Sequence, residues 1–416
     1  MRGGGRTGDW VKPWMLATLV AAAGWSCSDS DDHGGHGQAG GDGQQDAGGG
    51  SGGTGGGAGG TASGAAGAGA SSAAGSGGAG GMCAPAPCAV PGCAVGATPP
   101  QGTNLNDLWI GPNHEVWAVG DGGFVGRREP ESGAWCWCAP APPHSLYGVW
   151  GAASDNLFAV GERGIVVRFD GANWTATSLG ARLDLRAIDG TAGNDVWTVG
   201  AQGTAFHFDG QLWNGDFVDA RYEFHALWID PTGVAHAGGR APLPTDPNFP
   251  YMQFDEAFFL RHAPTGYGWQ VEGSISQWGG IDVLAIRGVS ATDIWAGGIN
   301  YPAGAAQGYG GLFRYDGTAW TAVSVPDDLL AGNYISDVAV NPPDGDGTLF
   351  VGSGGPLRYD GVNFTRPAEP AGATDIDVRG GEMYAVGSGG LVYRWTAHSG
   401  WIVERPLQRP PATGFF

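Results

Sequence analysis

The chain has 416 residues, of which 40 are acidic and 20 are basic, so its formal charge at pH 7 is −20. A nucleic-acid-binding surface needs a basic patch, and this balance therefore argues against nucleic acid as a partner. Glycine supplies 81 residues, far above its ordinary share. Much of that excess lies in one tract near the N-terminus.

The first 26 residues have the features of a targeting segment. Basic residues precede an apolar run at residues 14–25, which is too short to span a bilayer and fits the core of a secretory signal. The run ends just before Cys27, and polar residues follow at once. This pattern resembles a bacterial lipoprotein signal, which implies that residues 1–26 are removed and that Cys27 is acylated. Ser28 after the cysteine implies sorting to the outer membrane. The alternative is an ordinary cleaved signal with an incidental cysteine, which predicts a secreted protein.

Residues 27–81 are rich in Gly, Ser and Ala and lack apolar periodicity. Such a segment cannot bury a core, so we expect a disordered linker. A flexible chain of this length has a root-mean-square span of roughly 40 Å. The linker would let the rest of the chain reach partners beyond the membrane surface.

Residues 82–100 form a Cys- and Pro-rich segment containing Cys83, Cys88 and Cys93; Cys136 and Cys138 follow in the sequence WCWC. In an oxidising compartment these five residues are disulfide candidates rather than metal ligands. We expect Cys136 and Cys138 to pair with two of the three upstream cysteines, covering an exposed edge strand. A local bridge among the upstream cysteines, with free thiols elsewhere, is the alternative.

Residues 101–408 contain seven copies of one pattern. Each copy has an apolar strand, a second strand of the form D-φ-W-A-V-G, a third strand ending in R-φ-D-G, and a fourth strand that opens on an aromatic residue, usually Trp. The second strands are marked by Trp117, Phe158, Trp197, His236, Trp295, Phe350 and Tyr384. Four-stranded units at this period predict an all-β, seven-bladed β-propeller, followed by a tail at residues 409–416. Six or eight blades would result if the weak fourth copy or the Cys-rich segment is interpreted differently. We expect the first strand to be innermost, with its apolar residues on the central side, and the second-strand aromatic to pack between adjacent sheets.

Charged residues recur on the third strand and in the turn after it. They are Arg127, Arg168, His207, Arg261, Arg314, Arg358 and Arg394, with Asp170, Asp209, Asp316 and Asp360 in the turns. Each Arg and the Asp two residues on share a strand face, so the geometry permits an ion pair between them. Because these residues recur in nearly every copy, and because Asp-Gly suits a tight turn, we interpret them as architecture rather than as a ligand site.

The combination G-x-φ-x-R-x-D-G-x-x-W beside a W-A-V-G strand resembles the BNR or Asp-box class of propeller repeats and the propellers of photosystem assembly factors. The resemblance covers roughly residues 101–405. It departs from the Asp-box form S-x-D-x-G-x-T-W, because Asp and Gly are adjacent here. Sialidases share this repeat class, but their convergent arginines and their Tyr, Glu and Asp catalytic groups have no counterpart in the repeat register of this chain.

No catalytic motif stands out. The sequence lacks a G-x-S-x-G elbow and an H-E-x-x-H motif, and no pair of carboxylates breaks the repeat in the manner of a glycosidase. His33 and His36 are the only closely spaced histidines, and Asp344-Gly-Asp346 is interpreted as a turn rather than a calcium loop. We predict no catalytic residue, no cofactor and no metal.

Two neighbouring copies carry insertions between the second and third strands, at residues 240–256 and 299–309. Their aromatic side chains are Phe249, Tyr251, Phe254, Tyr301 and Tyr309. Exposed aromatic groups on Pro-containing loops suit sugar stacking or protein contacts, and these five are the candidate ligand-binding residues. The alternative is that they pack locally.

The sequence therefore favours a monomeric, non-catalytic binding module at the cell surface, with a protein or a glycan as ligand. A polysaccharide-active hydrolase or lyase, and an assembly scaffold for envelope complexes, are the alternatives. Fold alone does not decide among them.

Overall fold

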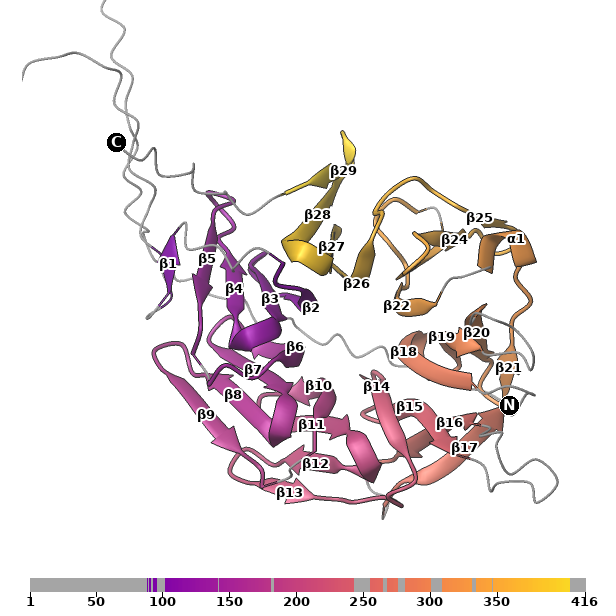
Figure 1. Ribbon diagram of the computed structural model, residues 1–416, viewed down its shortest axis with the longest axis horizontal. Helices are drawn as coiled ribbons and strands as arrows, with labels where there is room; N and C mark the ends of the chain where they lie inside the picture. Colours follow the sequence, from indigo (N-terminus) through magenta and orange to yellow (C-terminus); the bar gives the residue numbers. More distant parts are fainter. Residues whose placement is uncertain are drawn as a thin grey trace, which may run out of the picture. The chain divides into compact units, whose positions relative to one another are not determined.

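Seven antiparallel sheets stand around a common axis in the computed structural model (Figure 1). The structure describes residues 102–140, 142–180, 183–242, 255–264, 268–275, 281–300, 309–330, 334–345 and 347–404, together with residues 88, 90 and 93–95. The signal, linker and C-terminal tail expected from the sequence lie outside these residues. The seven-bladed, all-β propeller is confirmed.

Each blade consists of four strands that are consecutive in the chain. Blade 1 contains β2 (Leu105–Ile110), β3 (Val116–Gly120), β4 (Val125–Arg128) and β5 (Trp135–Cys138), with β1 (Ala94–Val95) added outside β5. Blade 2 contains β6 (Leu146–Ala153), β7 (Asn156–Gly161), β8 (Ile165–Phe169) and β9 (Trp174–Ser178). Blade 3 contains β10 (Leu185–Ala192), β11 (Asp195–Gly200), β12 (Ala205–Phe208) and β13 (Trp213–Gly215).

The remaining four blades follow the same order. Blade 4 contains β14 (Glu223–Ile229), β15 (Ala235–Pro242), β16 (Asp255–His262) and β17 (Gln270–Ile275). Blade 5 contains β18 (Ile281–Ser290), β19 (Asp293–Asn300), β20 (Tyr309–Tyr315) and β21 (Trp320–Ala322). Blade 6 contains β22 (Ile335–Ala339), β23 (Thr348–Gly352), β24 (Leu357–Tyr359) and β25 (Phe364–Thr365). Blade 7 contains β26 (Ala373–Arg379), β27 (Glu382–Gly387), β28 (Leu391–Thr396) and β29 (Gly400–Val403).

Short helices occupy a few of the connections. A 3₁₀ turn joins the second and third strands in blades 1, 2, 3 and 7: η1 (Asp121–Gly123), η2 (Glu162–Gly164), η3 (Ala201–Gly203) and η4 (Ser388–Gly390). We call the face of the ring that carries these turns the η face. The helix α1 (Asp327–Leu330) follows blade 5. No helix among the described residues is long and apolar enough to cross a bilayer.

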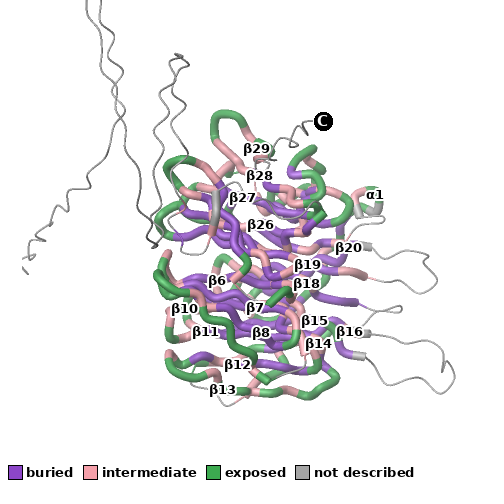
Figure 2. The backbone as a smooth tube through the Cα atoms, turned by 60° about the vertical axis from the view of Figure 1, so that its left-hand side comes forward, coloured by how far each residue is buried: buried purple, intermediate pink, exposed green. Residues whose placement is uncertain are grey.

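The second-strand aromatic side chains pack between neighbouring blades, as the sequence predicts. Trp117 lies edge-on to Trp174 of blade 2 at 5.9 Å between ring centroids, and Phe158 lies edge-on to Trp213 of blade 3 at 6.1 Å. Trp117 and Phe158 are fully buried. The middle strands of the blades are accordingly the most buried part of the molecule (Figure 2). Burial of large aromatic groups at every such junction holds adjacent sheets together.

The third-strand cations do not form ion pairs with the turn aspartates in blades 2, 3, 5 and 6. Each contacts instead a polar residue that lies just before the second strand of its own blade or at the start of that strand. Arg314 donates a hydrogen bond to Asp293 at 3.0 Å, and His207 lies 2.7 Å from Asp195. The turn aspartates are otherwise engaged: Asp170 Oδ1 accepts the N–H groups of Ala172 and Asn173. Only Arg127 of blade 1 contacts the residue two positions on, Glu129, at 3.4 Å. These repeated charges are therefore structural, as interpreted.

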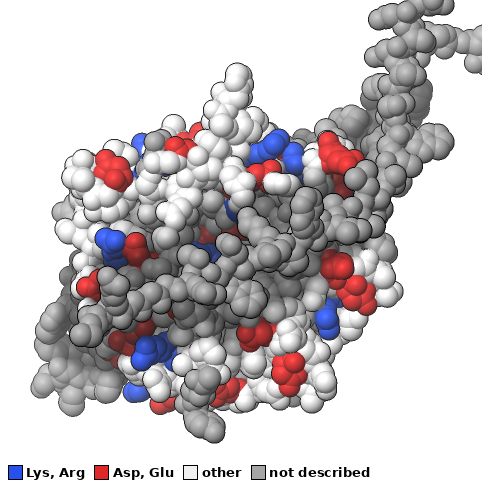
Figure 3. Space-filling view, turned by 180° about the vertical axis from the view of Figure 1, so that it is seen from behind, with Lys and Arg blue, Asp and Glu red and all other residues white. Residues whose placement is uncertain are grey.

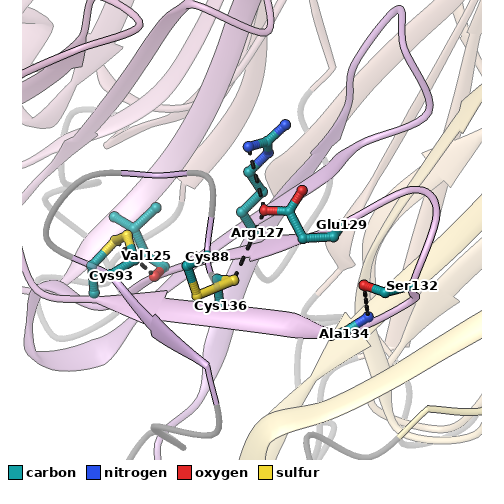
Figure 4. Close-up of a disulfide and its surroundings, with 9 residues drawn as sticks. Cys88, Cys93, Val125, Arg127, Glu129, Ser132, Ala134 and Cys136 are labelled. Carbon is teal, nitrogen blue, oxygen red and sulfur yellow. Dashed lines mark hydrogen bonds and ion pairs between the residues drawn. A yellow bond between two sulfur atoms is a disulfide. The ribbon is translucent and has the colours of Figure 1, made fainter. Parts of the chain in front are cut away.

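Two disulfides attach the segment before the ring to the outer edge of blade 1 (Figure 4). Cys88 is bonded to Cys136 and Cys93 to Cys138. Directly after Cys93, β1 pairs antiparallel with β5 and covers the outer edge of that strand. Cys83 lies outside the described residues.

Blades 1 and 7 close the ring through side chains. Arg128 of β4 donates two hydrogen bonds to the carboxylate of Glu404, at 2.8 and 3.0 Å. The Arg128 side chain is 7% exposed, so this pair is shielded from solvent. On the same seam, His114 lies 3.0 Å from Glu382, with its side chain 61% exposed.

Candidate functional site

A cavity of about 490 Å³ opens at the η face, on the axis of the ring. Its wall comes from the innermost strands of all seven blades, at the ends where they meet the last residues of the second strands. We call it the η-face cavity. Propellers offer a shared space of this kind because every blade contributes the same strand to the axis.

One residue of each innermost strand lines this cavity at an equivalent place. It follows the residue that pairs with the glycine near the end of the second strand, as Arg186 follows Leu185, which pairs with Gly200. The seven residues at this variable position are Asn106, Tyr147, Arg186, His225, Leu284, Ser336 and Thr374. Two places further on, every blade has an aliphatic residue: Leu108, Val149, Ile188, Leu227, Ile286, Val338 and Ile376. The repeat thus keeps the packing residue constant and changes the cavity residue in every blade.

A ring of aspartates surrounds the axis: Asp107, Asp337 and Asp375 line the η-face cavity, and Asp189 and Asp377 lie further toward the opposite face. Asp107 of blade 1 accepts the N–H of Val149 in blade 2 at 2.6 Å. The same kind of bond links other neighbouring innermost strands: Asp189 to Ile229, Asp337 to Ile376, Asp375 to Leu108 and Asp377 to Ile110. We call these five residues the axial aspartates. Each satisfies a backbone donor of the next blade, so they connect one sheet to the next.

Arg287 of blade 5 supplies the cation for this ring. Burial lowers the pKa of Arg287, but the carboxylates of Asp337, Asp189, Asp377 and Asp107 outweigh burial and raise it overall. The guanidinium therefore stays charged and neutralises part of the axial negative charge.

The pKa values of Asp107, Asp189, Asp337 and Asp375 are raised, so these four carboxyl groups resist ionisation. Burial raises the pKa of Asp107 to about 7 and that of Asp189 to about 6. Burial and the neighbouring carboxylates of Asp107 and Asp337 raise the pKa of Asp375 further. Hydrogen bonding to Asp375 lowers the pKa of both Asp107 and Asp337, so we expect Asp375 to hold the proton of this coupled group.

A second cavity of about 350 Å³ opens on the opposite face, and Arg287 lies on its wall as well. Trp109, Trp150 and Trp228 surround it. Each of these rings lies against a glycine of an adjoining blade, as Trp109 does against Gly151. The indole groups are therefore largely committed to packing between blades.

The innermost strands differ from the expectation that their apolar residues line the centre. Several do, but the axial aspartates and Arg287 also lie there. The sequence carries a signal for them, namely single Asp or Arg residues inside otherwise apolar strands, as in LNDLW and LAIRG. The repeat pattern alone does not reveal it, because these charges interrupt the apolar strands rather than mark the copies.

The two insertions leave from the η face. The second and third strands of blades 4 and 5 extend past their glycines as hairpins, ending at the pairs Pro242–Asp255 and Asn300–Tyr309. Phe249, Tyr251, Phe254 and Tyr301 lie outside the described residues. Tyr309 begins β20, and its side chain is not described. The proposal that these aromatic residues bind a ligand therefore stays a prediction.

Charge is mixed over the surface. On the face drawn in Figure 3, acidic and basic side chains lie interspersed rather than in one continuous basic area. Within the described residues, no group of three His, Cys, Asp or Glu side chains is placed to hold a metal ion.

Comparisons with known proteins point to the fold. No protein-family model matches the chain, and no curated protein matches it in sequence. Among solved structures, YCF48 from Cyanidioschyzon merolae is similar with a TM-score of 0.52 and 19% identity, covering 73% of this chain and 98% of that one. YCF48 bound to a D1 peptide gives a TM-score of 0.53 and 15% identity, covering 72% and 95%. Virginiamycin B lyase from Staphylococcus aureus gives 0.50 and 9%, covering 68% and 91%. Likeness at these identities establishes the β-propeller fold and nothing finer.

Proposed function

We propose that this chain is a non-catalytic binding module that takes part of a protein or glycan ligand into the η-face cavity. The observation that carries the proposal is the variable position, where seven equivalent places hold seven different side chains. In a protein built from repeats, a feature common to all blades serves the architecture. A place that differs in every blade and faces a cavity is free to serve recognition.

The chemistry of the variable position fits a polar ligand. It offers an amide, a phenol, a guanidinium, an imidazole and two hydroxyl groups around one apolar residue, Leu284. Such a mixture provides donors and acceptors for peptide groups or sugar hydroxyls. The aromatic residues of the two insertions would add stacking surface at the rim.

The similar solved structures are compatible with this function, since one of them is a YCF48 propeller bound to a D1 peptide. We further propose that the module works at the cell envelope as a monomer. It would be tethered through Cys27 as an outer-membrane lipoprotein or, failing acylation, secreted. The Gly-rich segment would supply the reach.

A polysaccharide hydrolase or lyase is the second candidate, and the protonated Asp375 beside Asp107 and Asp337 is the observation in its favour. Two features favour binding instead. The axial aspartates occupy two repeat positions, Asp107, Asp337 and Asp375 at one and Asp189 and Asp377 two residues further on, and each already accepts a backbone N–H of the next blade.

Blocking the cavity tests the proposal. Leu284→Trp would fill the space in front of the variable position without adding charge. We expect the full chain to bind a member of a panel of purified envelope polysaccharides and peptides, and the variant to lose at least tenfold in affinity by calorimetry. Val362→Trp is the matched control, because Val362 is 81% exposed in a turn of blade 6.

The same tubes are assayed for reducing ends and for unsaturated sugar products. Product formation would show that the chain is a polysaccharide-active enzyme and would contradict the proposal of a non-catalytic binding module. Equal binding by wild type and Leu284→Trp would remove the η-face cavity as the site and leave the assembly scaffold.

A further inference from the structure

Two members of the variable position differ from the others in having no hydrogen-bond partner within the described part of the chain. Arg186 of blade 3 and His225 of blade 4 come from adjacent innermost strands and both line the η-face cavity. Arg186 Nε and His225 Nε2 are buried atoms without a hydrogen bond among the described residues. Buried polar groups are nearly always paired, so two unpaired nitrogen atoms on side chains that line the same cavity need an explanation.

The other polar members of the set are satisfied within the ring. Asn106 donates to the carbonyl of Leu146 at 2.8 Å, and Ser336 donates to that of Thr374 at 2.6 Å. Tyr147 lies 3.3 Å from a carboxylate oxygen of Glu162. A side chain at the variable position can therefore form a hydrogen bond within the protein. Arg186 and His225 do not form one with any of the described residues.

None of the described carboxylates near Arg186 and His225 forms a hydrogen bond with either side chain, so both can bind an anionic ligand. Asp282 Oδ2 is the nearest carboxylate to His225, at 3.8 Å from Nε2, which is too long for a hydrogen bond. The same oxygen lies 3.9 Å from Nε of Arg240. Asp184, also on the cavity wall, accepts the backbone N–H of Arg163 at 3.1 Å. No carboxylate of the described residues forms an ion pair with Arg186.

His225 is held in its neutral form. Burial, and then the guanidinium groups of Arg186 and Arg240, lower its pKa to about 3. A neutral imidazole still carries one N–H and can donate beside the guanidinium. An anion placed between the two would gain charge-assisted hydrogen bonds, which must outweigh repulsion from Asp282 and from the aspartates of the cavity wall.

We infer that Arg186 and His225 form a subsite for a carboxylate of the ligand. This inference rests on the proposed function, because the ligand must enter the η-face cavity to reach it. The planar guanidinium fits a carboxylate with two parallel hydrogen bonds, and His225 adds a third donor. A glycan would supply the group as a uronic acid, and a protein would supply it as an acidic side chain. The chemistry at Arg186 is the same in both cases.

Four probes distinguish a glycan ligand from a protein ligand and test whether binding requires the negative charge. Tetragalacturonic acid is compared with its methyl ester, and the peptide acetyl-Gly-Ser-Asp-Gly-Ser-amide with its Asn analogue. Affinities for the full chain are measured by calorimetry. We expect at least one acidic probe to bind, its neutral counterpart to bind at least tenfold more weakly, and binding to perturb the His225 ring resonances. Which acidic probe binds identifies the source.

Arg186→Gln removes the cation and leaves a shorter, uncharged polar side chain. We expect it to weaken the acidic probe about tenfold or more and to abolish the preference over the neutral probe. Arg163→Gln is the matched control, since Arg163 lies in η2 on the same face but does not line the cavity. Its affinity should equal that of the wild type. Both variants are first shown to unfold at the wild-type temperature.

The outcomes distinguish this inference from the proposed function. Failure of both acidic probes to bind the wild type, or equal affinities of wild type and Arg186→Gln, would overturn the carboxylate subsite. If Leu284→Trp still abolished binding of the polysaccharide or peptide found in the panel, the binding module would stand. If it did not, the proposed function would fall as well.

Discussion

At the scale of single residues, the centre of the ring is held by groups that are costly to charge. The axial aspartates lose their hydration on folding and accept backbone hydrogen bonds across the blade junctions instead. Arg287 offsets part of their charge. A carboxyl whose pKa is higher in the folded state than in the unfolded state stabilises the fold while it is protonated. For Asp107 that contribution is complete below about pH 4, its unfolded value, and is lost as the pH rises through about 7. For Asp189 it is lost as the pH rises through about 6.

Asp375→Asn should remove part of this dependence on pH. The amide oxygen can still accept from Leu108, and the two N–H groups of the amide can donate to Asp107 and Asp337, whereas the protonated acid has a single O–H to donate. We expect wild type and variant to have equal free energies of unfolding at about pH 3.5, where the carboxyl is largely protonated in both the folded and the unfolded chain. At pH 8 the variant should be more stable by about 1 kcal/mol or more, since one pKa unit corresponds to about 1.4 kcal/mol. Urea unfolding at both pH values measures this, and a variant that is less stable at both would contradict the assignment of the proton.

At the scale of elements, the repeat explains which residues the sequence could predict. The glycine near the end of the second strand recurs in all seven blades, the second-strand aromatic in six, and the Asp-Gly turn in blades 2, 3, 5 and 6, so their recurrence allowed the propeller to be predicted. The glycine allows close contact: a Cβ on Gly200 would lie 2.0 Å from the carbonyl oxygen of Asp184. The cavity residues could not be found in this way, because Arg186 and His225 matter through differing from their counterparts. Arg186 and His225 come together because the innermost strands that carry them belong to adjacent blades of the ring.

Gly200→Ala should therefore destabilise blade 3. The obstacle is backbone rather than a movable side chain, so we expect a loss of about 2–3 kcal/mol in the free energy of unfolding. Gly273→Ala in β17 is the matched control, because its Cβ would meet only the Trp320 side chain, at 3.3 Å. Chemical unfolding of both variants decides the matter, and equal losses would mean that the contact at Gly200 is not what fixes the residue.

At the scale of the whole molecule, the ring depends on the seam between blades 1 and 7. Arg128 and Glu404 form a shielded, two-bond ion pair there, while His114 and Glu382 form an exposed one. A buried cation that loses its partner is costly, whereas an exposed pair contributes little.

Glu404→Gln should accordingly cost about 3 kcal/mol in the free energy of unfolding. Glu382→Gln, on the same two blades, should cost less than about 1 kcal/mol. Hydrogen exchange of β28 and β4 gives an independent reading, and should accelerate only in Glu404→Gln. Equal behaviour of the two variants would mean that the seam is held by packing and by the axial aspartates alone.

Each blade is made from one uninterrupted piece of chain, and among the described strands none is shared between the two ends of the ring. This arrangement allows the number of blades to change during evolution. Copying or deleting one stretch of the gene, about one repeat long, would add or remove a whole blade and leave every other blade intact. The uneven spacing of the copies, with long hairpins in two of them, fits growth by such duplication followed by separate elaboration of the copies.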